Sequence, residues 1–188
     1  MSRTVTNPPP LIAQETPAWC FAAAEQMARK YLGLDVPSQF KLAYDCLMVL
    51  VNAQLNPHFT NYMVACISDA FNNVTADSTP ALVALSGNQP NPNSQLVGLI
   101  SNTWGFVNHN NLNGTMYNAC TPQQFWTEIQ ANRIVIIGSA NHYYVVYGYE
   151  DTANAPFMLL VRDPMGGHAA SIPFTTFNGW ANKVVIRF

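Results

Sequence analysis

Apolar residues recur with helical spacing through the N-terminal half of the chain. The run AWCFAAAEQMARKYLG follows Thr16-Pro17 and ends at Gly33, so it predicts a helix capped by Thr16 with Cys20 in or near its first turn. Further helices are expected over residues 38–53, with Ser38 as the cap, over residues 56–73 and, shorter, over residues 93–106. Thr121-Pro122 repeats the Thr-Pro start and predicts a helix over residues 121–132.

From Arg133 onward the period changes to that of β-strands. Short runs rich in β-branched and aromatic residues cover residues 133–140, 142–150, 157–164 and 183–188, and Asn, Gly, Asp and Pro separate them. Helices followed by consecutive antiparallel strands predict an α+β fold. We expect one domain over residues 1–188, with a helical lobe over about 14–118, a β lobe over about 119–188 and an exposed loop over residues 86–95.

Composition and charge limit the class of protein. The chain has 188 residues, of which 49% are hydrophobic and 10% charged, as expected of a compact globular domain. A formal net charge of -2 supplies no basic field for nucleic acid or an anionic membrane surface. The chain lacks an apolar run of the roughly 20 residues that a membrane span needs, and its polar, Pro-rich start lacks the apolar region of a signal peptide. We expect a soluble protein without a Sec-type signal; low charge and abundant Asn are compatible with export by a dedicated system.

The four cysteines lie far apart, at Cys20, Cys46, Cys66 and Cys120. They show none of the Cys or His spacings of structural zinc sites, so no metal is expected. Their number allows two disulfides. Because Cys46 and Cys66 lie on apolar stretches that read as helix interiors, we favour core thiols in a reducing compartment.

Cys20 is the candidate nucleophile. A helix N-terminus lowers the pKa of a thiol because its unpaired backbone N–H groups carry partial positive charge. His142 begins a strand and could act as the base, while Asp163 ends the following strand and could accept a hydrogen bond from the imidazole. Gln14 could donate its side-chain N–H, together with the backbone N–H of Cys20, to a developing oxyanion. In isolation, Cys20 reads equally well as a small core residue.

Other residues have weaker claims. His168 follows two glycines and is a rival base, whereas His58 and His109 are interpreted as helix-cap and loop residues. Trp180 is either ordinary core or a ring that shields the histidine and its partner from water. The remaining aromatic residues of interest lie along one expected strand and are interpreted as core on one face: Tyr143, Tyr144, Tyr147 and Tyr149.

The stretches Q…WCFAA…M, NHYYVVYGYE and VRDPMGG together resemble the papain-like cysteine peptidases, and among them the compact bacterial branch of leader peptidases and effector proteases. The resemblance runs from Gln14 to Asp163 and the closing strands, and residues 34–118 contribute nothing to it. It implies a helical lobe packed on an antiparallel β lobe, with the active site in the cleft between them. It also implies Cys20 as nucleophile, His142 as base and later acid, Asp163 as the orienting residue and Gln14 in the oxyanion hole. Phe21 follows Cys20 where many relatives carry Trp.

The activity that the resemblance implies is that of a cysteine endopeptidase acting on protein or peptide substrates without a cofactor or metal. Since no transporter is encoded here, a bacterial effector or toxin is the favoured setting, with a cognate inhibitor or immunity protein as a further partner. An acyltransferase or deamidase could use the same triad. A binding module that has lost activity is the remaining alternative, and the intact set Gln14, Cys20, His142 and Asp163 argues against it.

Overall fold

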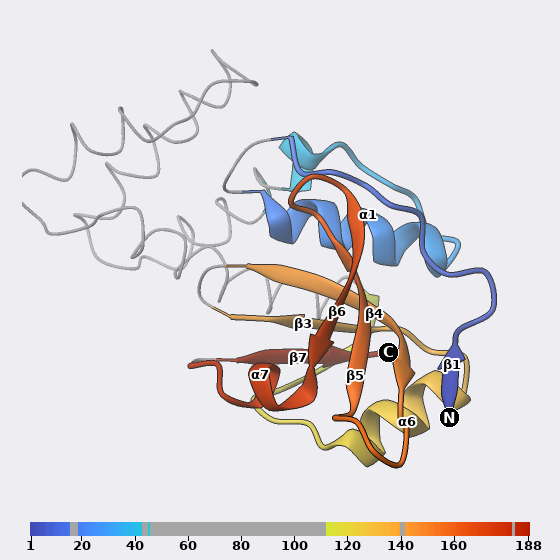
Figure 1. Cartoon of the computed structure of the whole chain (residues 1–188). Coiled ribbons are helices and arrows are strands. Elements are labelled where there is room, and N and C mark those ends of the chain that lie inside the picture. The colour runs from blue at the N-terminus through green and yellow to red at the C-terminus, as the bar shows by residue number, and fades with distance from the viewer. Residues whose placement is uncertain (16–18, 43–44, 46–111, 140–141, 182) are drawn as a thin grey trace, which may run out of the picture.

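One antiparallel sheet organises the part of the chain that the structure describes. That structure is a computed structural model, and it describes residues 1–15, 19–42, 45, 112–139, 142–181 and 183–188. Six strands follow the order β2-β7-β3-β4-β5-β6, and β1 pairs with the second half of β4 (Figure 1). The strands are β1 (Ser2–Thr4), β2 (Thr115–Tyr117), β3 (Val135–Gly138), β4 (Tyr143–Glu150), β5 (Met158–Asp163), β6 (His168–Pro173) and β7 (Val184–Arg187).

Local signals explain where the described helices begin and end. Helix α1 (Cys20–Tyr31) has Trp19 at its N-cap and ends in a Schellman motif, in which the Leu34 N–H donates to the Arg29 carbonyl at 2.9 Å and Gly33 has φ +70°. Helix α6 (Pro122–Gln130) begins with a capping box between Thr121 and Gln124. Helix α7 (Phe174–Asn178) follows β6 directly.

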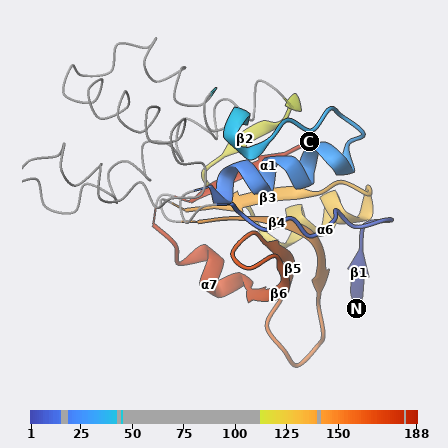
Figure 2. The same cartoon turned by 90° about the horizontal axis from the view of Figure 1, so that it is seen from above.

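Apolar side chains pack on both faces of the sheet. Figures 1 and 2 show α1 over one face, with α6 and α7 on the other side of the sheet in Figure 1. Phe21 and Met27 of α1 pack with Ile136 and Tyr143, while Val135 and Val146 belong to a second cluster with Phe177 of α7. Successive strand residues point to opposite faces, so neighbours in β3 serve different clusters. Burying each such side chain contributes about 1.5–3 kcal/mol.

The α+β class is confirmed, and the four expected strands appear as β3, β4, β5 and β7 with slightly shorter bounds. The expected place of Cys20 in the first turn of a helix is confirmed, but the N-cap is Trp19 and not the expected Thr16. The Thr121 cap is confirmed, and Ser38 begins a helical turn over residues 39–42, its Oγ accepting from the Lys41 N–H at 3.1 Å. Thr16 and Pro17, the helices expected over 56–73 and 93–106, and the loop over 86–95 lie outside the described residues.

The structure adds strands to the expected order of helices followed by strands. Strand β1 opens the chain, and β2 pairs with β7 although residues 115–117 fell within the expected helical lobe. Strand β6 and helix α7 were also not expected. The three residues of β1, and likewise those of β2, are all exposed, so no apolar alternation marks them as strands.

Candidate active site

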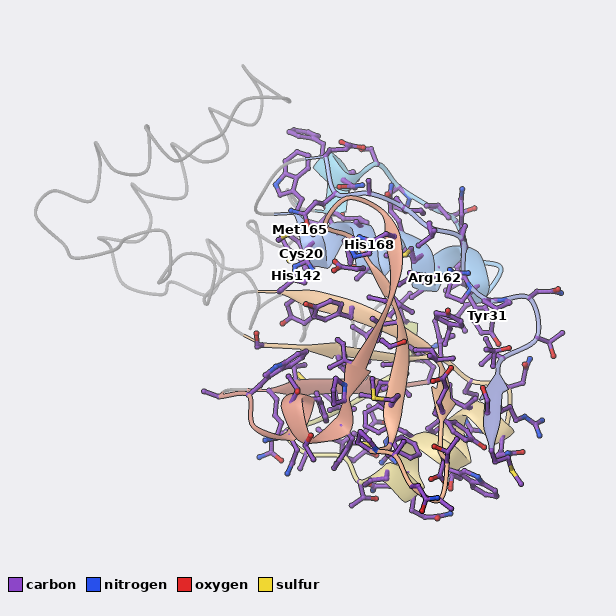
Figure 3. All side chains as sticks on the ribbon, in the orientation of Figure 1. Cys20, Tyr31, His142, Arg162, Met165 and His168 are labelled. Atoms are coloured by element: carbon purple, nitrogen blue, oxygen red, sulfur yellow. The ribbon has the colours of Figure 1, made fainter. Side chains whose placement is uncertain are left out.

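The fold gathers the ends of three elements at one edge of the sheet. Cys20 is the first residue of α1, His142 immediately precedes β4, and Asp163 is the last residue of β5. Figure 3 shows the labelled side chains of Cys20, His142, Met165 and His168 grouped near the N-terminus of α1. Residues that are remote in the chain therefore meet at this edge.

His142 and Asp163 form a short, largely buried pair. The His142 Nε2 lies 2.6 Å from the Asp163 Oδ1, and the two side chains are 12% and 13% exposed. The same Oδ1 accepts the backbone N–H of Met165 at 2.8 Å. A carboxylate accepts from Nε2–H, which leaves Nδ1 as the nitrogen that can take up a proton. The expected hydrogen bond between these side chains is confirmed.

The thiol of Cys20 is close to this pair and buried. Its side chain is 2% exposed, and burial raises the pKa of the thiol from its ordinary value of 9.0 to about 11. Backbone hydrogen bonds from Tyr143, Phe21 and Cys20 itself lower that pKa, and the negative charge of Asp163 raises it further. The helix N-terminus therefore acts in the expected direction, but desolvation outweighs it, so the net shift of the Cys20 pKa is upward.

A glycine makes room for the ring of Tyr143, the residue that follows His142. Gly138 of β3 pairs with Tyr143, and a Cβ at Gly138 would lie 2.3 Å from the Tyr143 ring. The missing side chain allows that ring to be fully buried, directly after His142 in the chain. Packing at this position thus fixes the backbone that carries His142.

Aromatic rings form one wall of the site. The His142 ring meets the Tyr144 ring edge-on at 4.5 Å between centroids, and Tyr144 stacks on Trp180 at 5.7 Å. Burial, followed by the charges of Asp163 and Cys20, raises the pKa of the Tyr144 phenol. The sequence suggests Trp180 as a candidate for the ring that shields His142. In the structure, the ring in contact with His142 is that of Tyr144, and Trp180 stacks on Tyr144.

The interpretation of the tyrosines of β4 as core on one face is wrong for Tyr144. Tyr143 and Tyr149 are fully buried in the cluster beneath α1, and Tyr147 packs against it, whereas Tyr144 packs with the second cluster. The sequence spacing could have placed Tyr144 at the site, because residues two apart on a strand share a face, and Tyr144 is two residues after His142.

His168 approaches the same carboxylate from the next strand. Asp163 and His168 are register partners in the β5–β6 hairpin, and the His168 Nε2 lies 3.8 Å from the Asp163 Oδ2. The His168 Nδ1 is 2.9 Å from the Met165 carbonyl oxygen, and the side chain is 58% exposed. Of the two histidines, His142 makes the close and shielded contact.

The segment that carries Gln14 is bound to the same hairpin turn. The backbone N–H of Gln14 donates to the Pro164 carbonyl at 2.9 Å, and the side-chain oxygen of Gln14 is buried. Gly167, with φ +60°, turns the chain so closely against this segment that a Cβ there would lie 3.1 Å from Ala13. Gln14 thus lies beside the turn that follows Asp163.

The remaining sequence expectations concern other cysteines, metals and membranes. Cys120 is buried and, like Cys20, is not in a disulfide, while Cys46, Cys66, His58 and His109 lie outside the described residues. Among the residues that the structure describes, no group of three or more His, Cys, Asp or Glu could hold a metal ion. No helix in those same ranges has the length and apolar character needed to cross a membrane.

Neither a protein-family model nor a curated protein matches the chain.

Proposed function

We propose that the chain is a papain-like cysteine endopeptidase in which Cys20 is the nucleophile, His142 the general base and Asp163 the residue that orients and stabilises the imidazole. The observation that carries the proposal is the 2.6 Å contact between His142 and Asp163 beside a thiol at the first position of a helix. A nucleophile, a base within a constrained pair and an orienting carboxylate are the parts that covalent acyl transfer requires.

The raised pKa of Cys20 determines how the first step proceeds. Because the buried thiol keeps its proton at neutral pH, the His142 Nδ1 takes that proton as the sulfur attacks the peptide carbonyl. The Asp163 carboxylate stabilises the imidazolium that results. The backbone N–H of Cys20 and the Gln14 amide would stabilise the tetrahedral oxyanion.

The imidazolium then gives its proton to the leaving amine, and the carbon–nitrogen bond breaks to leave a thioester on Cys20. Water attacks the thioester while His142 accepts one of its protons. The carbon–sulfur bond then breaks, the His142 imidazolium returns that proton to the sulfur, and the acid product leaves. We extend the proposal to a bacterial effector or toxin acting on proteins, with an immunity protein as a further partner, on the sequence resemblance alone.

Cys120 provides an internal control for the alternative in which Cys20 is a core residue. Both thiols are buried, at 2% and 5% exposure, and burial raises the pKa of each to about 11. As two core residues they would react with a peptidyl acyloxymethyl ketone at similarly slow rates, limited by unfolding. As a nucleophile with a base, Cys20 should react at least about 100-fold faster than Cys120.

Site-resolved mass spectrometry of the native protein would measure both rates. His142→Ala should remove the advantage of Cys20, whereas His168→Ala should leave it. Equal labelling of Cys20 and Cys120 in the wild type would show that Cys20 is a core residue. A fast rate at Cys20 that His142→Ala does not lower would show that His142 is not its base.

A further inference from the structure

Gln39 is a buried polar side chain next to the segment that carries Gln14. It is 1% exposed and lies in the helical turn over residues 39–42. Its Nε2 donates to the Ala13 carbonyl at 2.8 Å, and its Oε1 accepts the backbone N–H of Glu15 at 2.8 Å. The two bonds therefore hold the residues immediately before and after Gln14.

The side-chain amide of Gln39 acts here like a neighbouring strand. In an extended chain, the backbone N–H and C=O groups of successive residues point to opposite sides, and those of residues two apart point to the same side. The Ala13 carbonyl and the Glu15 N–H point toward Gln39, and the Gln14 N–H points the other way and donates to the Pro164 carbonyl at 2.9 Å. The backbone at Gln14 is thereby fixed from both sides.

The orientation of the Gln39 amide is itself determined. Its nitrogen is also 3.2 Å from the Gln26 Oε1, and the Gln26 Nε2 donates to the Pro37 carbonyl at 2.7 Å. If the Gln39 amide were flipped, its NH2 group would face the Glu15 N–H, donor against donor, and its oxygen would face the Ala13 carbonyl, acceptor against acceptor. A side chain with one donor end and one acceptor end, and of this length, suits the position.

We propose that Gln39 is a positioning residue that holds the Gln14 amide where the oxyanion develops. The inference rests on the proposed function, since it concerns the oxyanion donor of that site. A displacement of about 1 Å in such a group costs on the order of 100-fold in rate. Gln39 itself does not touch the substrate in this account.

The test compares two substitutions in bonds to the same N-terminal segment. Gln39→Met keeps the length of the side chain and removes both bonds that flank Gln14. Arg162→Met is the matched control, because the Arg162 Nε donates to the Pro9 carbonyl at 3.0 Å, and the guanidinium lies 4.4 Å from the Tyr147 ring centroid. Along β5 this side chain points away from the face that carries Asp163.

On a quenched fluorescent peptide that the wild type cleaves, Gln39→Met should lower kcat about 10- to 100-fold with KM within about twofold. Arg162→Met should change kcat by less than about twofold. In a Gln14→Ala background, Gln39→Met should lower kcat by less than about twofold further, because its effect acts through Gln14. An equal loss from Gln39→Met in both backgrounds would mean a general structural role and would overturn the proposal.

Amide hydrogen exchange in the resting protein separates this inference from the proposed function. Exchange at the Glu15 N–H should become at least about tenfold faster in Gln39→Met and stay unchanged in Arg162→Met. If the wild type cleaves no peptide but Glu15 responds in this way, the proposed function has failed, while the role of Gln39 in holding the segment that carries Gln14 is supported. If Glu15 exchange is unchanged in Gln39→Met, Gln39 does not hold the segment that carries Gln14, and the inference is overturned whatever the activity.

Discussion

Replacing Asp163 by Asn removes one negative charge from beside the His142 ring while keeping a hydrogen-bond acceptor in place. The Asp163 Oδ1 accepts from both the His142 Nε2 at 2.6 Å and the Met165 N–H at 2.8 Å. In Asp163→Asn, the Met165 N–H requires the carbonyl oxygen, rather than the NH2 group, at that position. His142 therefore keeps its proton on Nε2, and Nδ1 remains a base.

The expected loss follows from the change in that hydrogen bond. A bond to a charged group contributes about 1.5–3 kcal/mol and a neutral one about 0.5–1.5 kcal/mol, so losing the charge costs about 1–2 kcal/mol. The imidazolium exists in the transition state, so this cost falls on the rate and corresponds to about 5- to 30-fold in kcat/KM. Asp163→Ala, which also removes the acceptor and releases the ring, should lose more than Asp163→Asn.

The assay is kcat/KM for a quenched fluorescent peptide, measured for wild type, Asp163→Asn and Asp163→Ala under identical conditions. Circular dichroism of each variant controls for folding. A loss below about twofold in Asp163→Asn would show that the carboxylate is not coupled to the chemistry. A loss above about 1000-fold in a folded Asp163→Asn protein would show that the Met165 N–H does not keep the ring in its working tautomer.

Three further predictions concern the neighbouring residues. Gln14→Ala should lower the single-turnover rate about 10- to 1000-fold without slowing alkylation of Cys20; parallel losses would exclude an oxyanion role. His142→Ala should cost at least about 100-fold in kcat/KM, and His168→Ala less than about threefold, because His168 is 58% exposed and 3.8 Å from Asp163; the reverse order would identify His168 as the base. Because the folded Cys20 thiol keeps its proton up to about pH 11 and the unfolded thiol loses it near pH 9.0, stability should fall by about 3 kcal/mol across that interval. Cys120, whose thiol pKa is also raised to about 11 by burial, adds a similar fall. In urea unfolding, Cys20→Ser should therefore reduce the total fall by about 3 kcal/mol and leave the part that Cys120 contributes; an identical pH slope in both proteins would contradict the burial of the Cys20 thiol.

The parts of the fold that the sequence predicted are those with local signals. Helix α6 carries its own Thr-Pro start and Gln124 in a capping box, and Gly33 marks the end of α1. The β-branched runs from residue 134 onward are buried strands whose composition is sufficient to identify them. The contact between His142 and Asp163 was predictable because consecutive antiparallel strands bring such ends together.

Other features depend on contacts between distant segments. Strand β1 exists because residues 2–4 pair with β4, and β6 because residues 168–173 pair with β5, although neither segment alternates in polarity. The direction of the pKa shift at Cys20 depends on how deeply the thiol is buried, which spacing along the chain does not reveal. Gln39 meets Ala13 and Glu15 through two side-chain bonds, and amide side chains carry no sequence signal for such partners.

The most direct test of the account is cleavage of an unbiased peptide library by the purified wild type and by Cys20→Ser, with the products identified by mass spectrometry. The account predicts new N- and C-terminal fragments from the wild type and none from Cys20→Ser, since serine in that position lacks the acidity and nucleophilicity of the thiol. Intact peptides with a gain of about one mass unit would indicate side-chain deamidation, and acylated peptides would indicate acyl transfer. Cleavage by both proteins, or no chemistry from the wild type, would contradict the assignment of Cys20 as the nucleophile of a peptidase.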